Sequence, residues 1–174
     1  MRETMENKGE VSSVKCLAFR RLLPGPIEKV WAHLTDTTFL PAWFGEDSSI
    51  EGRQGGVVRL MGGHIRGVVT QWQPPKKLIC TWNVFNPNDG PDAVSAYPES
   101  YLTFELEARE RNEVALIFTH FPFLERFVPQ SAVGWHTMLD ILIAALNGEA
   151  IEERADYMRK NAELYNVDLN NLAR

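Results

Sequence analysis

The spacing of hydrophobic residues changes midway along this chain, and that change constrains the fold more than any other feature. From residue 48 to residue 121, apolar and polar residues alternate with a period of two, which is typical of half-buried β-strands. Six successive strands are predicted there, at 48–52, 55–62, 64–73, 76–84, 101–110 and 112–121. A further strand, rich in β-branched and aromatic residues, is predicted at 11–23.

The links between these strands indicate how the strands pair. Most links are short and carry turn residues, as in the sequences GRQGG and PPKK. A parallel pair needs a connection of about a dozen residues or more, so short links indicate antiparallel neighbours. The sequence therefore predicts an antiparallel sheet of about seven strands. Which face the 64–72 strand turns inward stays open, because Gly67 permits a bulge.

Helical spacing flanks the strand region on both sides. Residues 27–34 carry apolar side chains at i, i+3, i+4 and i+7, and 39–44 form a second, shorter apolar face. Residues 134–148 are apolar over an arc of roughly 200°, which suits a helix enclosed by a curved sheet. A last helix with a narrow apolar stripe follows from Ile151, and the sequence leaves open whether the two helices are continuous or broken at 147–148.

The order of elements is thus one strand, two short helices, six strands and a long C-terminal helix. This order is typical of an α+β fold with helices packed on one face of an antiparallel sheet. A length of 174 residues suits a single domain. We expect a flexible tail at 1–10, the domain at 11–166 and a frayed C-terminus at 167–174.

Composition excludes several classes of protein. The net charge is −5 and no Lys/Arg cluster extends beyond short pairs, so a nucleic-acid partner is not expected. No apolar run reaches the roughly 20 residues of a membrane span. The polar N-terminus lacks the apolar stretch of a signal peptide, which favours a cytoplasmic location. Cys16 and Cys80 lie in strand-like runs. They could pair in an oxidising compartment, but we favour free, buried thiols in a reducing one.

Several segments in order carry a family resemblance. They are PIEKVWAHLTD, FLPAWFG, EGRQGGVVRLM, RGVVTQWQPPKKLICTW, LIFTHF and GWHTMLDILIAAL, which together cover roughly residues 15 to 147. In this order and spacing the chain resembles the helix-grip (START-like, SRPBCC) superfamily. Within that superfamily it is most similar to the activator of heat-shock protein 90 ATPase homologue-like proteins.

The resemblance implies a curved sheet wrapped around the long C-terminal helix, with an apolar cavity between them. The superfamily includes lipid carriers, hormone receptors, polyketide cyclases and chaperone-associated domains, so the fold alone does not select a function. We favour binding of a small hydrophobic or amphipathic molecule, with no reaction evident. The alternatives are a cyclase-like or hydratase-like enzyme that uses the same cavity, and a chaperone-interaction module. The chain is expected as a monomer or a homodimer.

The residues expected to contact a ligand follow from the inward faces of the strands and of the long helix. Leu116, Phe118 and His120 alternate along one strand and therefore share a face. His120 and Arg59 are the expected polar contacts, although a core histidine and a surface arginine fit the same positions. The full set expected to line the cavity is Arg59, Trp82, Phe104, Phe118, His120, Trp135 and Leu139. Simple core packing of the aromatic members stays an alternative. No catalytic residue, metal site or cofactor is expected.

His136 and Asp140 are the most conspicuous polar pair on the long helix. They lie four residues apart on its narrow polar face, away from the centre of the apolar arc. We interpret them as an exposed helix-surface pair and not as a catalytic or metal-binding pair, since no third ligand lies at a matching spacing.

The segment 86–100 is the one long link between predicted strands. It is too long for a plain hairpin, and its three prolines prevent it from joining the sheet. The sequence therefore predicts a lid that gates the cavity.

Overall fold

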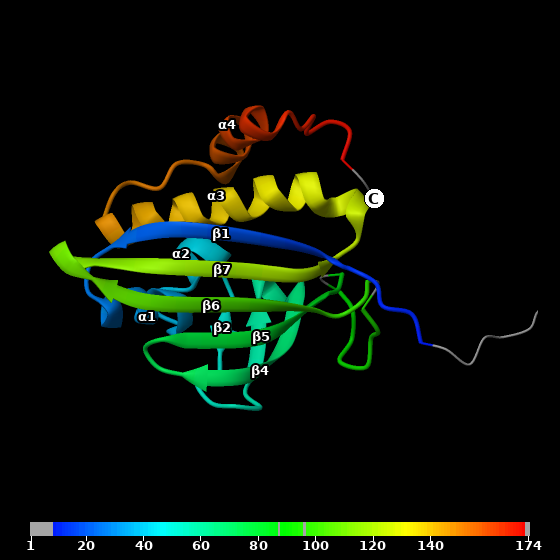
Figure 1. Ribbon diagram of the computed structural model, residues 1–174, viewed down its shortest axis with the longest axis horizontal. Coiled ribbons are helices and arrows are strands. Elements are labelled where there is room, and N and C mark those ends of the chain that lie inside the picture. Colours follow the sequence, from blue (N-terminus) through cyan, green and yellow to red (C-terminus); the bar gives the residue numbers. More distant parts are fainter. Residues whose placement is uncertain (1–8, 87, 96, 173–174) are drawn as a thin grey trace, which may run out of the picture.

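The structure of the protein is a computed structural model that describes residues 9–86, 88–95 and 97–172. The tail expected at 1–10 lies almost entirely outside the described residues. The described chain contains a seven-stranded antiparallel sheet in the order β1-β7-β6-β5-β4-β3-β2 (Figure 1). The strands are β1 (Lys15–Pro24), β2 (Ser49–Ile50), β3 (Val57–Leu60), β4 (Ile65–Gln73), β5 (Lys77–Val84), β6 (Ser100–Arg109) and β7 (Glu113–Phe123). The predicted sheet is therefore confirmed.

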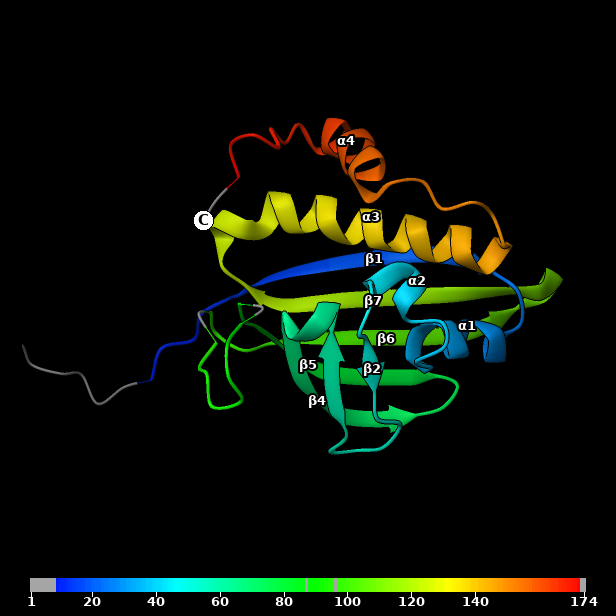
Figure 2. The ribbon, with the colours of Figure 1, turned by 180° about the vertical axis from the view of Figure 1, so that it is seen from behind.

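Four α-helices and three short 3-10 helices complete the described chain. The α-helices are α1 (Ile27–Thr35), α2 (Pro41–Phe44), α3 (Val128–Asn147) and α4 (Arg154–Tyr165). The 3-10 helices are η1 (Met61–Gly63), η2 (Glu110–Asn112) and η3 (Glu125–Phe127). Seen from behind the sheet, α1 and α2 lie in front of the central strands and α3 runs along β1 (Figure 2). This is the helix-grip arrangement that the sequence predicts.

The boundaries of the long helix differ from the prediction. α3 begins at Val128, six residues before the expected start, because Pro129 fits a first helical turn where no N–H is needed. It ends at Gly148, whose left-handed backbone (φ 68°) allows its N–H to bond back to the carbonyls of Ala144 and Ala145. The C-terminal helical region is therefore interrupted at this glycine, and α3 and α4 are separate helices. Ile151 lies in the linker and is exposed.

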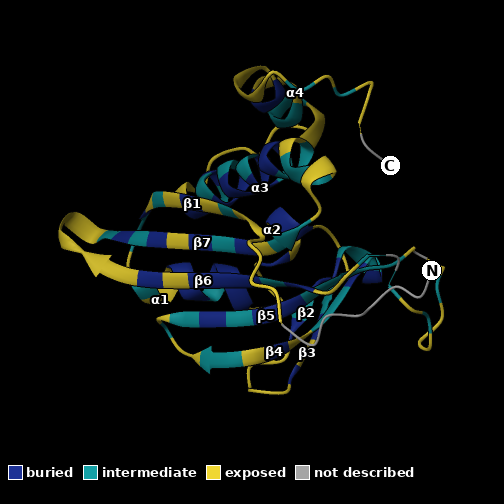
Figure 3. Ribbon diagram, turned by 45° about the vertical axis from the view of Figure 1, so that its right-hand side comes forward, coloured by how far each residue is buried: buried dark blue, intermediate teal, exposed yellow. Residues whose placement is uncertain are grey.

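The apolar arc of α3 faces the concave side of the sheet, as predicted. Trp135, Leu139, Leu142 and Leu146 are at most 5% exposed. Figure 3 shows buried residues along α3 and on the central strands, while the outer surface of α4 is largely exposed. One continuous core therefore joins α1, α2 and α3 to the sheet.

The structure shows which face of β4 points inward. Ile65 and Val69 are buried, whereas Val68 is 44% exposed. The register against β5 shifts between Val69 and Gln71, so the bulge lies there and not at Gly67. Glycine is needed at position 67 for a different reason, because a Cβ there would lie 2.0 Å from the Thr81 carbonyl oxygen. Only the absence of a side chain allows the two strands to approach this closely.

The polar edge of α3 is covered by α4, which corrects the interpretation of His136 and Asp140 as an exposed pair. The Asn161 side-chain amide donates to the Asp140 carboxylate at 2.9 Å, and His136 Nδ1 lies 2.9 Å from the Tyr165 hydroxyl. The carboxylate of Asp140 is 3.7 Å from His136 Nε2. These polar groups fasten α4 to α3, a contact that periodicity within one helix does not reveal.

The two cysteines are free, as predicted, but only one is buried. Cys16 is exposed near the start of the edge strand β1, which corrects the expectation that both thiols are buried. Burial raises the pKa of the Cys80 thiol to about 12. Cys80 therefore stays in the unreactive thiol form at neutral pH.

Leu142 tests the packing of α3 against the sheet, because its side chain is fully buried. We expect Leu142→Ala to lower the free energy of unfolding by about 2–5 kcal/mol, since the change leaves a cavity in the core. The matched control is Leu164→Ala on α4, where the leucine is 65% exposed and the expected loss is below about 0.5 kcal/mol. Urea denaturation measures both, and equal losses would contradict this packing.

Candidate functional site: an apolar cavity beside His120

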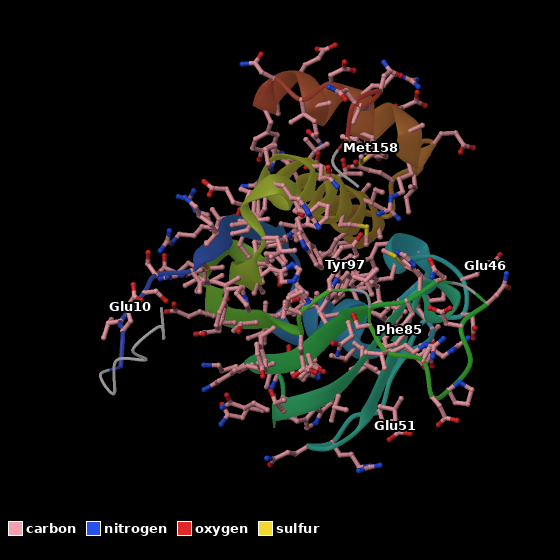
Figure 4. All side chains as sticks on the ribbon, turned by 90° about the vertical axis from the view of Figure 1, so that its right-hand side faces the viewer. Glu10, Glu46, Glu51, Phe85, Tyr97 and Met158 are labelled. Atoms are coloured by element: carbon pink, nitrogen blue, oxygen red, sulfur yellow. The ribbon has the colours of Figure 1, made fainter. Side chains whose placement is uncertain are left out.

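A cavity of about 510 Å³ lies between the sheet and the N-terminal half of α3. Its volume falls within the roughly 300–1,000 Å³ typical of small-molecule sites. In Figure 4, Tyr97 lies at this end of the molecule, between α3 and the strands. Most of the lining is apolar, and it comprises Val14, Phe44, Met61, Trp82, Val84, Tyr97, Pro98, Pro122, Phe123, Leu124, Phe127, Gly134, Trp135 and Met138, with the polar residues Ser100, His120, Gln130, Ser131 and Arg154.

Three aromatic side chains from three different elements form the inner wall. Trp82 of β5 lies with its ring centroid 5.2 Å from that of Trp135 of α3. Phe44 of α2 meets Trp135 edge-to-face at 6.2 Å. Such contacts are favourable for aromatic rings and hold the wall rigid without filling the cavity.

His120 is the polar group at the inner end of the cavity, and both of its ring nitrogens are hydrogen-bonded. The indole N–H of Trp135 donates to His120 Nδ1 at 2.9 Å. The Ser100 hydroxyl oxygen lies 2.8 Å from His120 Nε2 and also donates to the Trp82 carbonyl at 3.1 Å. The side chain is 4% exposed, so this network holds it away from bulk water.

The partners of His120 fix where its proton lies. An indole nitrogen can only donate, so Nδ1 of His120 must be the acceptor, and the proton of the neutral ring is on Nε2. The ring therefore donates to Ser100, whose own proton goes to the Trp82 carbonyl. Each donor in this hydrogen-bond network has one acceptor, and each buried polar atom of the network is satisfied.

Ser100 and His120 have the spacing of a nucleophile and its base, but not the right proton arrangement. A base would need a free lone pair on Nε2 to remove the serine proton. In this network Nε2 carries the proton, while Nδ1 is occupied by Trp135. Burial also lowers the pKa of His120 to about 3, which makes it a poor proton acceptor at neutral pH. The geometry suits a fixed polar contact to a ligand and not acid–base chemistry.

Arg154 is the only charged side chain among the described residues that line the cavity. It is the first residue of α4 and is an exposed residue. Partial shielding from water lowers its pKa from the ordinary value, but a guanidinium stays charged at neutral pH. The cavity thus has a neutral interior and a positive entrance.

The residues predicted from the sequence are distributed over three places. Trp82, His120 and Trp135 line the cavity together. Phe104, Phe118 and Leu139 lie in the core behind this wall and are at most 3% exposed. Arg59 is outside the lining, because its guanidinium is 3.1 Å from the carboxylate of Asp47 and also donates to the Gly62 carbonyl.

The predicted lid segment contributes directly to the cavity wall. Tyr97 and Pro98 line the cavity, and the Tyr97 ring lies edge-on to Phe127 at 5.1 Å. Residues 87 and 96 of the predicted lid segment lie outside the described part of the chain. Farther back, Arg66 donates to the carbonyls of Asp89 and Gly90, which anchors the segment to β4.

Sequence reasoning missed Phe44, Ser100, Gly134 and Arg154 as lining residues. Phe44 and Gly134 could have been found from the sequence, since they lie in segments already predicted to be helical and adjacent to the cavity. Arg154 carried none, because its position depends on how the linker after Gly148 folds back over α3.

The fold agrees with comparisons to known proteins. The sequence profile of the family described as Activator of Hsp90 ATPase homolog 1-like protein matches residues 24–147. The chain belongs to this family. The resemblance found in the sequence is therefore confirmed. The matched region runs from the end of β1 to the end of α3, so α4 and its Arg154 follow it.

Solved structures share the helix-grip fold. The crystal structure of CalU16 from Micromonospora echinospora is 22% identical with a TM-score of 0.68, and the alignment covers 88% of this chain and 87% of that one. The Aha1 dimer from Colwellia psychrerythraea is 26% identical with a TM-score of 0.59, covering 76% and 96%. PFC0360w, an HSP90 activator from Plasmodium falciparum, is 21% identical with a TM-score of 0.60, covering 78% and 97%.

The comparison with curated proteins gives no significant match. Within the described ranges, no helix is long and apolar enough to cross a membrane, and no group of three or more acidic, histidine or cysteine side chains is placed to hold a metal ion.

The buried, neutral state of His120 predicts a specific pH dependence of stability. Its pKa is about 3 in the folded protein, against an ordinary value of 6.5. As the pH falls below 6.5, the unfolded chain therefore binds a proton at His120 before the folded chain does, and stability is lost until the pH approaches 3. Between pH 7 and pH 5 we expect the wild type to lose about 2 kcal/mol more than His120→Gln. Chemical denaturation at the two pH values measures this, and parallel losses would show that His120 is not held neutral.

Proposed function

We propose that the protein binds a small hydrophobic or amphipathic molecule in the cavity between the sheet and α3. One observation carries this proposal, namely a cavity of about 510 Å³ with a mostly apolar lining and a few polar groups at defined places. An apolar ligand gains roughly 25 cal/mol for each Å² that it removes from water. The rigid aromatic wall lowers the cost of ordering the site on binding.

An enzyme that uses the same cavity is less well supported. His120 is the one histidine in the lining, and its bonds to Trp135 and Ser100 leave neither nitrogen free to move a proton. The arrangement favours a binding protein over a cyclase-like or hydratase-like enzyme.

A chaperone-interaction module is a second candidate, and family membership favours it. One similar structure is named an HSP90 activator, and another is named the Aha1 dimer. Such a module would act through its outer surface, so its activity would not depend on an accessible cavity. This difference separates the two candidates experimentally.

The proposal is tested with a neutral, environment-sensitive dye such as Nile red. We expect dye fluorescence to rise on addition of the protein and to fall when fatty acids or aromatic acids compete for the site. Native mass spectrometry of freshly purified protein, compared with the denatured mass, shows whether a ligand is carried from the cell. If no dye binds and no compound displaces it, the chaperone-interaction candidate is preferred.

Gly134 offers a way to close the cavity without disturbing the core. It lies in the N-terminal half of α3 and lines the cavity, and a Cβ built on it meets no atom within 4 Å. We expect Gly134→Phe to fill this space and weaken dye binding at least tenfold, which corresponds to about 1.4 kcal/mol.

The matched control is Gly134→Ala at the same position. The methyl group leaves most of the cavity open, so dye binding should stay near the wild-type value. Replacing a helical glycine should also raise the free energy of unfolding by about 0.5–1 kcal/mol. Unchanged dye binding in a correctly folded Gly134→Phe variant, as judged by circular dichroism, would place the ligand elsewhere.

A further inference from the structure

The charge around the cavity is distributed unevenly. No carboxylate occurs among the described lining residues, and Arg154 is the one charged group. A ligand with a cationic head would find no opposite charge among the described lining residues, whereas an anionic head would meet the Arg154 guanidinium. Charge complementarity of this kind selects among ligands that share the same apolar body.

Four other arginines of the described chain have an ion-pair partner, whereas Arg154 has none among the described residues. The four ion pairs are Arg53 with Glu51, Arg59 with Asp47, Arg109 with Glu107 and Arg159 with Asp156. Arg154 makes no ion pair and no hydrogen bond with the described residues. Its guanidinium is therefore free to bind an incoming group without breaking an existing contact.

We propose that the ligand is an amphipathic carboxylic acid, whose carboxylate binds the Arg154 guanidinium while its apolar body lies against Trp82 and Trp135. This inference rests on the proposed function, because it names the ligand class of the same cavity. A guanidinium can donate two parallel hydrogen bonds to a carboxylate, a geometry that fixes the head group as well as attracting it.

Arg154, at the start of α4, and the tryptophans of the aromatic wall come from different elements but line the same cavity. In Figure 4, α4, marked by Met158, lies on the outer side of α3, whereas Tyr97 lies between α3 and the sheet. Arg154 begins α4, and the aromatic wall lies beneath α3. The neutral His120 network at the inner end adds no charge that would compete for the carboxylate.

A single negative charge suits this entrance better than two. Glu152 and Glu153 precede Arg154 in the sequence and are exposed, so the local positive charge is limited. A phosphate monoester carries about −1.5 to −2 at neutral pH and would leave charge uncompensated here. A carboxylate carries one charge and matches the one guanidinium.

The test compares dodecanoic acid with dodecanol and dodecyl phosphate as competitors of Nile red. The acid and the phosphate are kept below their micelle concentrations, and the alcohol is kept below its solubility limit. The alcohol has the same apolar chain as the acid without the charge. In the wild type we expect the acid to bind more tightly than the alcohol and at least as tightly as the phosphate. Arg154→Gln should weaken the acid about threefold to tenfold and leave the alcohol unchanged, as expected for a charged hydrogen bond partly shielded from water.

Arg159→Gln is the matched control, since Arg159 lies on the same helix but is paired with Asp156 outside the cavity lining. It should leave all three competitors unchanged. Equal affinity of acid and alcohol for the wild type, or equal losses for both in Arg154→Gln, would overturn the carboxylate inference and leave the proposed cavity function intact. If neither the acid nor the alcohol displaces the dye, both proposals fail.

Discussion

The α3 helix buries its wide apolar arc against the concave face of the sheet, and both the fold and the cavity depend on that contact. Trp135 lies where the two meet. Its ring packs 4.3 Å from that of Phe118 in the core, and its N–H satisfies His120 at the inner end of the cavity. The same side chain therefore anchors the helix, forms part of the cavity wall and fixes the proton of the neighbouring histidine.

The sheet and the inward face of α3 could be predicted because they depend on local patterns. Alternation along β6 and β7 identifies Phe104 and Phe118 as inward residues without knowledge of their partners. The apolar arc of α3 follows in the same way from a spacing of 3.6 residues. Gly67 was recognised as unusual, but its cause, the approach of the Thr81 carbonyl, depends on the neighbouring strand.

The site was predicted only in part, because its polar groups are positioned by contacts between distant segments. The sequence predicts Arg59 as an anchor and gives no signal for Arg154. Arg59 forms an ion pair with Asp47, whereas the chain after Gly148 folds back over α3 and brings Arg154 to the cavity. The protonation of His120 depends on Trp135, which belongs to another element. Alternation along one strand places a residue on a face but does not identify its hydrogen-bond partners.

The pairing of β1 with β7 has a consequence for the synthesis of the chain. Phe19 of β1 lies opposite Phe118 of β7, so β1 can pair within the sheet only after β7 has been synthesised. The helix that covers the concave face is made later still. Pairings between distant segments slow folding, and uncovered apolar surfaces favour aggregation in the meantime. The nascent chain therefore leaves the ribosome with its aromatic face uncovered, and the protein can reach its native state only after residues 128–147 have emerged.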